Sequence, residues 1–98
     1  MIISEYKSLT QFRKFLTSLC RAVHTGKKEL IVTYHQQPVF KVVKLKNDEL
    51  NDELDPTLPE RSFIEVVREQ SEFLDAIEMH GVVILTAHGK RSVRCEKI

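Results

Sequence analysis

The feature that most constrains this fold is an amphipathic helix that ends at a glycine and leads into a β-hairpin. Between Thr10 and Gly26, apolar side chains recur at spacings of three and four, which places them on one face of a helix of about 14 residues. Thr10 stands where an N-cap is expected, and Gly26 follows the last turn. Residues 30–45 then form two β-branched, aromatic-rich runs around a turn at 35–38, which predicts a hairpin. Residues 2–9 alternate weakly and predict a short strand ahead of the helix.

The second half of the chain repeats this plan. Residues 62–81 carry an apolar stripe that a glycine ends, and residues 82–98 predict a second hairpin with its turn at His88–Lys90. The first strands of the two hairpins share a pattern: residues 31–35 and 84–88 are identical at three of five positions. We therefore favour an internal duplication of one strand–helix–hairpin unit.

The segment between the two units differs in composition from both. Residues 47–60 contain the repeat NDEL-NDEL, two prolines and six acidic residues without a basic one. Such a segment buries little apolar surface and is typical of a linker. The sequence thus predicts an α+β protein with a first unit at 1–46, an acidic linker at 47–60 and a second unit at 61–98.

Charge is distributed unevenly along the chain, although the net charge is only +1. Residues 1–46 contain nine Lys and Arg against two Glu, a balance of +7. Residues 61–80 are acidic, and the last eighteen residues are basic again. A basic block beside an acidic one favours a polyanionic partner for the first and a basic protein partner for the second, unless the two blocks neutralise each other in the fold.

Several classes of protein are disfavoured by what the sequence lacks. No run approaches the roughly 18 apolar residues of a membrane span, and the start of the chain is unlike a secretory signal, so we expect a cytoplasmic protein without a membrane partner. The four histidines and two cysteines have no metal-ligand spacing. Cys20 lies on the apolar stripe, where packing explains it better than nucleophilic chemistry. We expect a binding protein that is not an enzyme and needs no cofactor.

A family resemblance rests on the ordered combination of these motifs across nearly all of residues 1–46. The chain resembles the N-terminal domain of Phd/YefM-type antitoxins (the prevent-host-death family), with a short strand, an S-E-F-R-like helix start, a glycine-ended helix, a strand ending in Thr and a V-x-V-like strand. The corresponding residues are Thr10–Arg13, Leu16–Thr17, Leu19–Cys20, Val23, Gly26, Ile31–Thr33, Pro38–Val39 and Val42–Val43.

The resemblance implies a dimeric domain that presents positive charge to operator DNA, together with a region that binds and blocks a toxin, often a ribonuclease. The dimer could form between two chains, or within one chain as a pseudo-dimer of the two units. The first hairpin departs from the family pattern, because Gln36-Gln37 replaces the usual glycine and base. The turn at Thr86–Lys90 is closer to that pattern.

Candidate binding residues follow from the resemblance and from the charge pattern. Arg13 matches the family arginine near the helix start, where phosphate or groove contacts are favoured. The candidate DNA-binding residues are Thr10, Arg13, Lys14, Lys27, Lys28, His88, Lys90 and Arg91. The candidate toxin-binding residues are Asp48, Glu49, Leu50, Leu54, Phe73 and Leu74.

Three functions remain open at this point. The leading expectation is an antitoxin that neutralises a cognate toxin and represses its own operon. The second is a stand-alone DNA-binding regulator, and the third is a protein-binding adaptor or immunity-like protein that has kept the fold without DNA binding. The charge of residues 1–46 favours the first two, whereas Gln36-Gln37 in the first turn favours the third.

Overall fold

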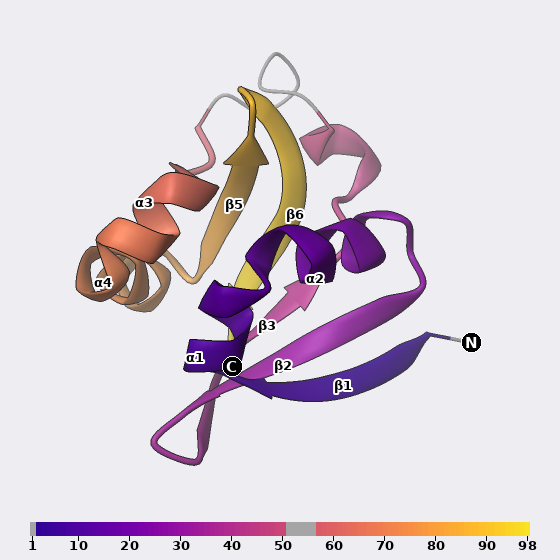
Figure 1. The fold of residues 1–98 in the computed structure, drawn as a ribbon. Helices are drawn as coiled ribbons and strands as arrows, with labels where there is room; N and C mark the ends of the chain where they lie inside the picture. Colours follow the sequence, from indigo (N-terminus) through magenta and orange to yellow (C-terminus); the bar gives the residue numbers. More distant parts are fainter. Residues whose placement is uncertain (1, 51–56) are drawn as a thin grey trace.

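A computed structural model describes residues 2–50 and 57–98 of the chain (Figure 1). The described residues form one mixed α/β body with a six-stranded sheet and four helices. The elements are β1 (Ile3–Ser8), α1 (Leu9–Lys14), α2 (Leu16–His24), β2 (Lys28–Tyr34), β3 (Gln37–Val43), the 3-10 turn η1 (Asn47–Glu49), β4 (Glu60–Ser62), α3 (Phe63–Arg68), α4 (Gln70–His80), β5 (Val82–Ala87) and β6 (Lys90–Lys97).

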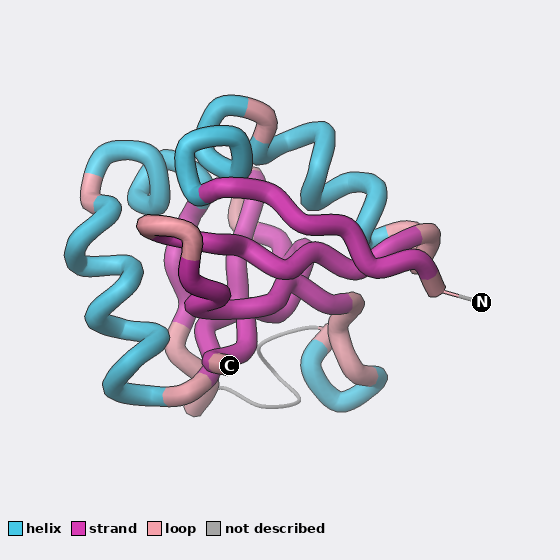
Figure 2. The backbone as a smooth tube through the Cα atoms, turned by 90° about the horizontal axis from the view of Figure 1, so that it is seen from below, coloured by secondary structure: helices cyan, strands magenta, loops and turns pink. Residues whose placement is uncertain are grey.

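The strand order in the sheet is β1-β2-β3-β6-β5-β4. Each outer strand runs parallel to its neighbour, and the three inner pairings are antiparallel. The four helices lie on one side of the sheet, while η1 lies on the other (Figure 2). The two hairpin turns are at opposite ends of the molecule (Figure 1).

The order of elements in the first half recurs in the second, as strand, two helices and a hairpin. The pairing register recurs with it, because Ser8 lies opposite Thr33 and Ser62 lies opposite Thr86. Each hairpin also shifts register at the same place, after Val32 in one and after Leu85 in the other. The two halves therefore have the same local architecture.

The helical segment of each half is broken in the middle, which corrects the prediction of one continuous helix. The backbone leaves helical geometry at Phe15 and again at Glu69. The apolar periodicity identified the side chains that face the core, but periodicity does not report a bend of the helix axis. The prediction that Thr10 is the N-cap was also wrong. Ser8 is the N-cap, because its hydroxyl accepts from the Gln11 backbone N–H and the Gln11 side chain accepts from Ser8 in return.

The hairpin turns are tighter than the sequence suggested. His35 and Gln36 have positive φ angles and form a two-residue turn, as do His88 and Gly89. Left-handed conformations at both central positions are typical of the type I′ turn, whose twist matches that of the strands. Pro38 consequently belongs to β3, next to the register shift, where a missing N–H is tolerated.

One hydrophobic core serves both halves. Alternate residues of the strands point toward the helices, and the same cluster contains side chains from all four helices. At its centre the Phe40 ring packs edge to face against Phe12 of α1 and Phe73 of α4, with centroids 5.6 and 5.5 Å apart. Because this aromatic row takes one ring from each helix pair, the two halves are packed as one unit.

Candidate functional site

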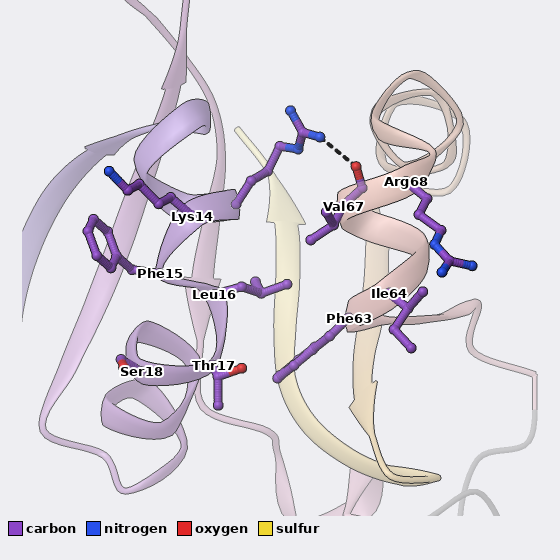
Figure 3. Close-up of a pocket in the computed structure, with 10 residues that line it drawn as sticks. Lys14, Phe15, Leu16, Thr17, Ser18, Phe63, Ile64, Val67 and Arg68 are labelled. Carbon is purple, nitrogen blue, oxygen red and sulfur yellow. Dashed lines mark hydrogen bonds between the residues drawn. The ribbon is translucent and has the colours of Figure 1, made fainter.

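A groove lies between the two helix pairs, on the surface of the described residues. It encloses about 420 Å³, between the bend that joins α1 to α2 and the short helix α3 (Figure 3). Leu16 and Phe63 point toward each other across it, one from each half of the chain. The groove therefore exists only because segments about fifty residues apart pack side by side. Its lining residues are Arg13–Ser18, Phe63, Ile64, Val67 and Arg68.

Arg13 spans the groove and ties the two halves together. Its Nη2 donates a hydrogen bond of 2.5 Å to the backbone carbonyl of Val67, drawn as the dashed line in Figure 3. This carbonyl lies in the last turn of α3, where helix geometry leaves carbonyl groups without an intrahelical partner. The Nε of Arg13 is buried and has no hydrogen-bond partner in the part of the chain that is described.

The groove is positively charged. Three of its lining residues are Arg13, Lys14 and Arg68, and none of the ten is acidic. Lys14 and Arg68 point away from each other on opposite flanks (Figure 3), and the Lys14 ammonium lies 5.5 Å from the centre of the Phe15 ring. A low-dielectric floor between cations of one sign strengthens the attraction for a negatively charged group.

Large apolar side chains are exposed at the same place. Phe15 is 52%, Ile64 62% and Val67 42% exposed to solvent. Single exposed apolar residues are ordinary, but several that line one hollow are typical of an interaction surface.

A second hollow, of about 340 Å³, has a different character. It lies where α4 meets the ends of β3 and β6, and it contains both Glu78 and Lys97, whose ion pair measures 2.8 Å. Charges of both signs compensate each other there. The groove beside α3 therefore remains the stronger candidate for an anionic partner.

The predicted DNA-binding residues do not form one cluster. Arg13 and Lys14 line the groove, and exposed Thr10 lies one turn earlier in α1. Lys27 and Lys28 are at the far end of β1, since Lys28 pairs with Ile3 in the parallel register. The Lys28 ammonium is 2.8 Å from a carboxylate oxygen of Glu5, so part of its charge is neutralised.

Three further candidates lie at the turn between β5 and β6, at the opposite end from the first hairpin turn (Figure 1). His88 and Lys90 are exposed. Arg91 is buried instead, with its Nε 2.7 Å from a carboxylate oxygen of Glu60 and its Nη1 donating to the Glu49 carbonyl at 3.2 Å. These contacts place Arg91 in the packing between β6 and its neighbours rather than on the surface.

The predicted toxin-binding residues also divide by burial. Asp48 and Leu50 are exposed and Leu74 is half-buried, whereas Leu54 lies outside the described residues. Phe73 belongs to the aromatic row of the core, and Glu49 is buried in an ion pair with Arg94. A partner could reach Phe73 or Glu49 only if this part of the chain opened.

Sequence reasoning missed half of the groove. The apolar stripe predicted over residues 62–81 was interpreted as one face of a continuous helix, whereas in the structure Val66 is buried and Val67 is exposed on a short helix that ends at Arg68. Phe63, Ile64 and Arg68 were not singled out at all. A signal was present in Ser62 and Glu65, which together form a capping box that begins a separate short helix here.

The remaining reactive groups of the described residues give no second site. They contain no cluster of three or more His, Cys, Asp or Glu side chains that could hold a metal ion. Cys20 and Cys95 are both buried free thiols. Burial raises the pKa of Cys20 to about 12, and burial together with the nearby Cys20 sulfur raises the pKa of Cys95 well above its usual value.

The fold and the groove thus define a mixed α/β protein with a cationic, apolar surface hollow shared by its two halves. Among the helices of residues 2–50 and 57–98, none has the length and apolar character that crossing a membrane requires. Comparisons with protein-family models, curated proteins and solved structures give no match to this chain.

Proposed function

We propose that this chain is an antitoxin-type binding protein, not an enzyme, that resembles the Phd/YefM family and carries both units of the family dimer in one polypeptide. The proposal has two parts, an operator-DNA surface on the first helix pair and a protein partner, the cognate toxin. The recurring register supports the tandem arrangement. Thr33 and Thr86 are 53 positions apart, as are Val42 and Cys95, which pair with each other between β3 and β6.

This register has the form expected of a dimer interface. On either side of the Val42–Cys95 pair, Lys41 lies opposite Glu96 and Val43 lies opposite Arg94. Adding 53 to the first member of either pair gives a residue of the other pair, so the contact is self-complementary in the way that an isologous dimer contact is. Sedimentation at several concentrations tests this part: a monomeric chain supports a pseudo-dimer, and an obligate dimer favours dimerisation between chains.

The observation that carries the DNA-binding part is a set of exposed, unpaired cations on and next to the first helix pair. Lys14, Arg21 and Lys27 are exposed on α1, on α2 and just after α2, and within the described residues none of them has an acidic partner. Lys44 adds to this set, because its Nζ is 3.7 Å from where a Cβ on Gly26 would be, beside Lys27. Unpaired cations along one helix pair suit the phosphate backbone of a duplex.

The second half offers an internal comparison. Lys97 is 53 positions after Lys44, and it is paired with Glu78 at 2.8 Å. The equivalent position is therefore neutralised in one half and free in the other, as far as the described residues extend. This difference supports a DNA-facing role for the first helix pair alone.

Binding of a labelled duplex that contains the upstream region of the gene tests the DNA-binding part. We expect binding at low salt that weakens steeply as salt is raised. The double variant Lys27→Ala/Lys44→Ala should lower the slope of log affinity against log salt by about 2, one for each lost phosphate contact. Lys97→Ala is the matched control and should leave the slope unchanged. If both variants changed the salt slope equally, Lys27 and Lys44 would not be the DNA-contacting residues. If the wild type did not bind the duplex at low salt, the repressor role would be ruled out.

The toxin-binding part needs a separate test. Expression of the neighbouring reading frame should arrest growth if it encodes a toxin, and co-expression of this chain should restore growth. If the chain binds DNA without a neutralisable neighbour, the stand-alone regulator is the better description. If the chain binds a protein but no DNA, a protein-binding adaptor is the better description. The apolar groove beside α3 is the observation that favours this adaptor function.

A further inference from the structure

Three exposed apolar residues from the two halves of the chain meet in the groove. Phe15 projects from the bend between α1 and α2, and Ile64 and Val67 belong to α3. All three line the same hollow, although they come from different halves of the chain. Each side chain exposes about half of its area to water, and burying that area against a partner would be favourable.

The floor and the rim of the groove differ in chemistry. Leu16 is buried beneath it and Phe63 is packed against the core, so the floor is apolar and anchored. The rim carries Arg13, Lys14 and Arg68 without a lining carboxylate. Arginines and aromatic residues around an apolar centre are enriched at protein interfaces, and they match a segment that presents apolar side chains among carboxylates.

We propose that this groove docks an acidic segment of a partner protein, which inserts one or two large apolar side chains between the α1–α2 bend and α3 and places carboxylates near Arg13, Lys14 and Arg68. A volume of about 420 Å³ is enough for such anchors. The segment is an amphipathic helix or an extended strand whose apolar residues occupy the groove. This proposal does not depend on the DNA-binding part, since it rests on the exposed apolar residues of the groove, although Lys14 is used in both.

A protein segment fits the groove better than duplex DNA does. The surface of a duplex consists largely of phosphate and sugar, and phosphate contacts account for most of its hydrogen bonds to proteins. Such a surface would leave Phe15, Ile64 and Val67 without an apolar counterpart. The cations alone suit either ligand, so the apolar residues decide between them.

The link between Arg13 and Val67 fixes the width of the groove. The hydrogen bond joins the last turn of α1 to that of α3, so the two walls cannot separate without breaking it. A preformed groove avoids part of the ordering cost of binding. Specificity for the partner then depends on the packing of the two halves of the chain.

The test is selection from a random displayed-peptide library against the full-length chain, followed by binding measurements with the selected peptides. We expect the selected sequences to combine Asp or Glu with Leu, Ile or Phe. Ile64→Glu should weaken their binding at least tenfold, since it places a carboxylate beside the docked ones, and Arg68→Glu should do the same. Met79→Glu introduces the same charge at a 78% exposed residue of α4 outside the groove and should leave binding unchanged.

Circular dichroism should show that each variant is folded, because all three positions are exposed. The proposal is overturned if no acidic-apolar consensus is selected, or if Ile64→Glu and Met79→Glu affect binding equally. It is also overturned in favour of a nucleic acid if Ile64→Glu weakens duplex DNA binding while the selected peptides are unaffected. Chemical-shift changes of Ile64 and Val67 on adding peptide locate the contact independently.

Discussion

Val42 and Cys95 lie opposite each other in the two central strands of the sheet, and neither side chain is exposed to solvent. Val42 comes from β3 of the first half and Cys95 from β6 of the second. The pairing of β3 with β6 continues the sheet from one half into the other, so each half covers apolar surface that the other would expose. The stability of either half should therefore depend on the presence of both.

Val42→Ala tests this dependence. The substitution removes two buried methyl groups and leaves a small cavity, so we expect a loss of about 2 kcal/mol in the free energy of unfolding. Both tyrosines, Tyr6 and Tyr34, are in the first half, whereas Ile84 is in the second. Tyrosine fluorescence and the Ile84 methyl resonance should therefore report the same urea midpoint, shifted equally by the variant. Two separate midpoints would contradict a shared core. Met79→Ala, at an exposed site, is the control.

The repeated local pattern is what the sequence predicted best. Gly81 ends α4 in the left-handed conformation, with φ of 77°, and Gly26 follows α2 with φ of 79°, as their positions indicated. Both hairpins and the strand at Ile3–Ser8 were also predicted. These features are encoded within a few neighbouring residues, by apolar period and turn chemistry, and local patterns of this kind are readable from one sequence.

Features that depend on contacts between distant segments were not predictable in the same way. Strand β4 has only three residues, Glu-Arg-Ser, and shows no apolar alternation. Because β4 was not foreseen, neither was the burial of Arg91, whose partner Glu60 is the first residue of that strand. The groove likewise requires the bend at Phe15 to meet α3, a contact that no local pattern specifies.

The ion pair between Glu49 and Arg94 should hold η1 against the sheet face opposite the helices. Glu49 is buried, and Arg94 pairs across the strands with Val43 and Ile84, which are buried on the same face. Glu49→Ala would remove one of the two carboxylates that contact the Arg94 guanidinium and leave Glu96, 3.0 Å from the Arg94 Nε, as the other. We therefore expect a loss of about 2 kcal/mol in the free energy of unfolding, measured in urea.

Two further variants test whether the loss of stability in Glu49→Ala comes from the broken ion pair with Arg94. Asp48→Ala changes an exposed neighbour and should alter stability by less than about 0.5 kcal/mol. The double variant Glu49→Leu/Arg94→Met removes both charges and should recover most of the loss. A Glu49→Ala protein as stable as the wild type would show that η1 is held by other contacts.

Glu5 should make stability depend on pH in the acid range. Hydrogen bonds from Lys28 and Lys7 lower the pKa of the Glu5 carboxyl from 4.5 to about 2. Since the folded pKa is lower than the unfolded one, the stabilisation is complete above about pH 4.5 and is lost as the pH falls toward 2.

Thermal unfolding of the wild type and Glu5→Gln should differ at neutral pH and converge near pH 2. A constant difference over this range would contradict the assignment. Added salt should reduce the difference, because the group is near the surface.

The two thiols should be unreactive in the folded protein. Cys20 and Cys95 are fully buried, and burial raises the pKa of the Cys20 thiol to about 12, so almost no thiolate is present at neutral pH. A disulfide-exchange reagent at pH 8 should therefore label neither cysteine in buffer and both in denaturant. The labelling rate in buffer then measures how often the core opens, and Val42→Ala should raise this rate, since it weakens the strand that faces Cys95. Leu50→Ala, at an exposed site, should leave the labelling rate in buffer unchanged. Rapid labelling of the wild type would show that the core opens far more readily than a shared, fully packed sheet allows.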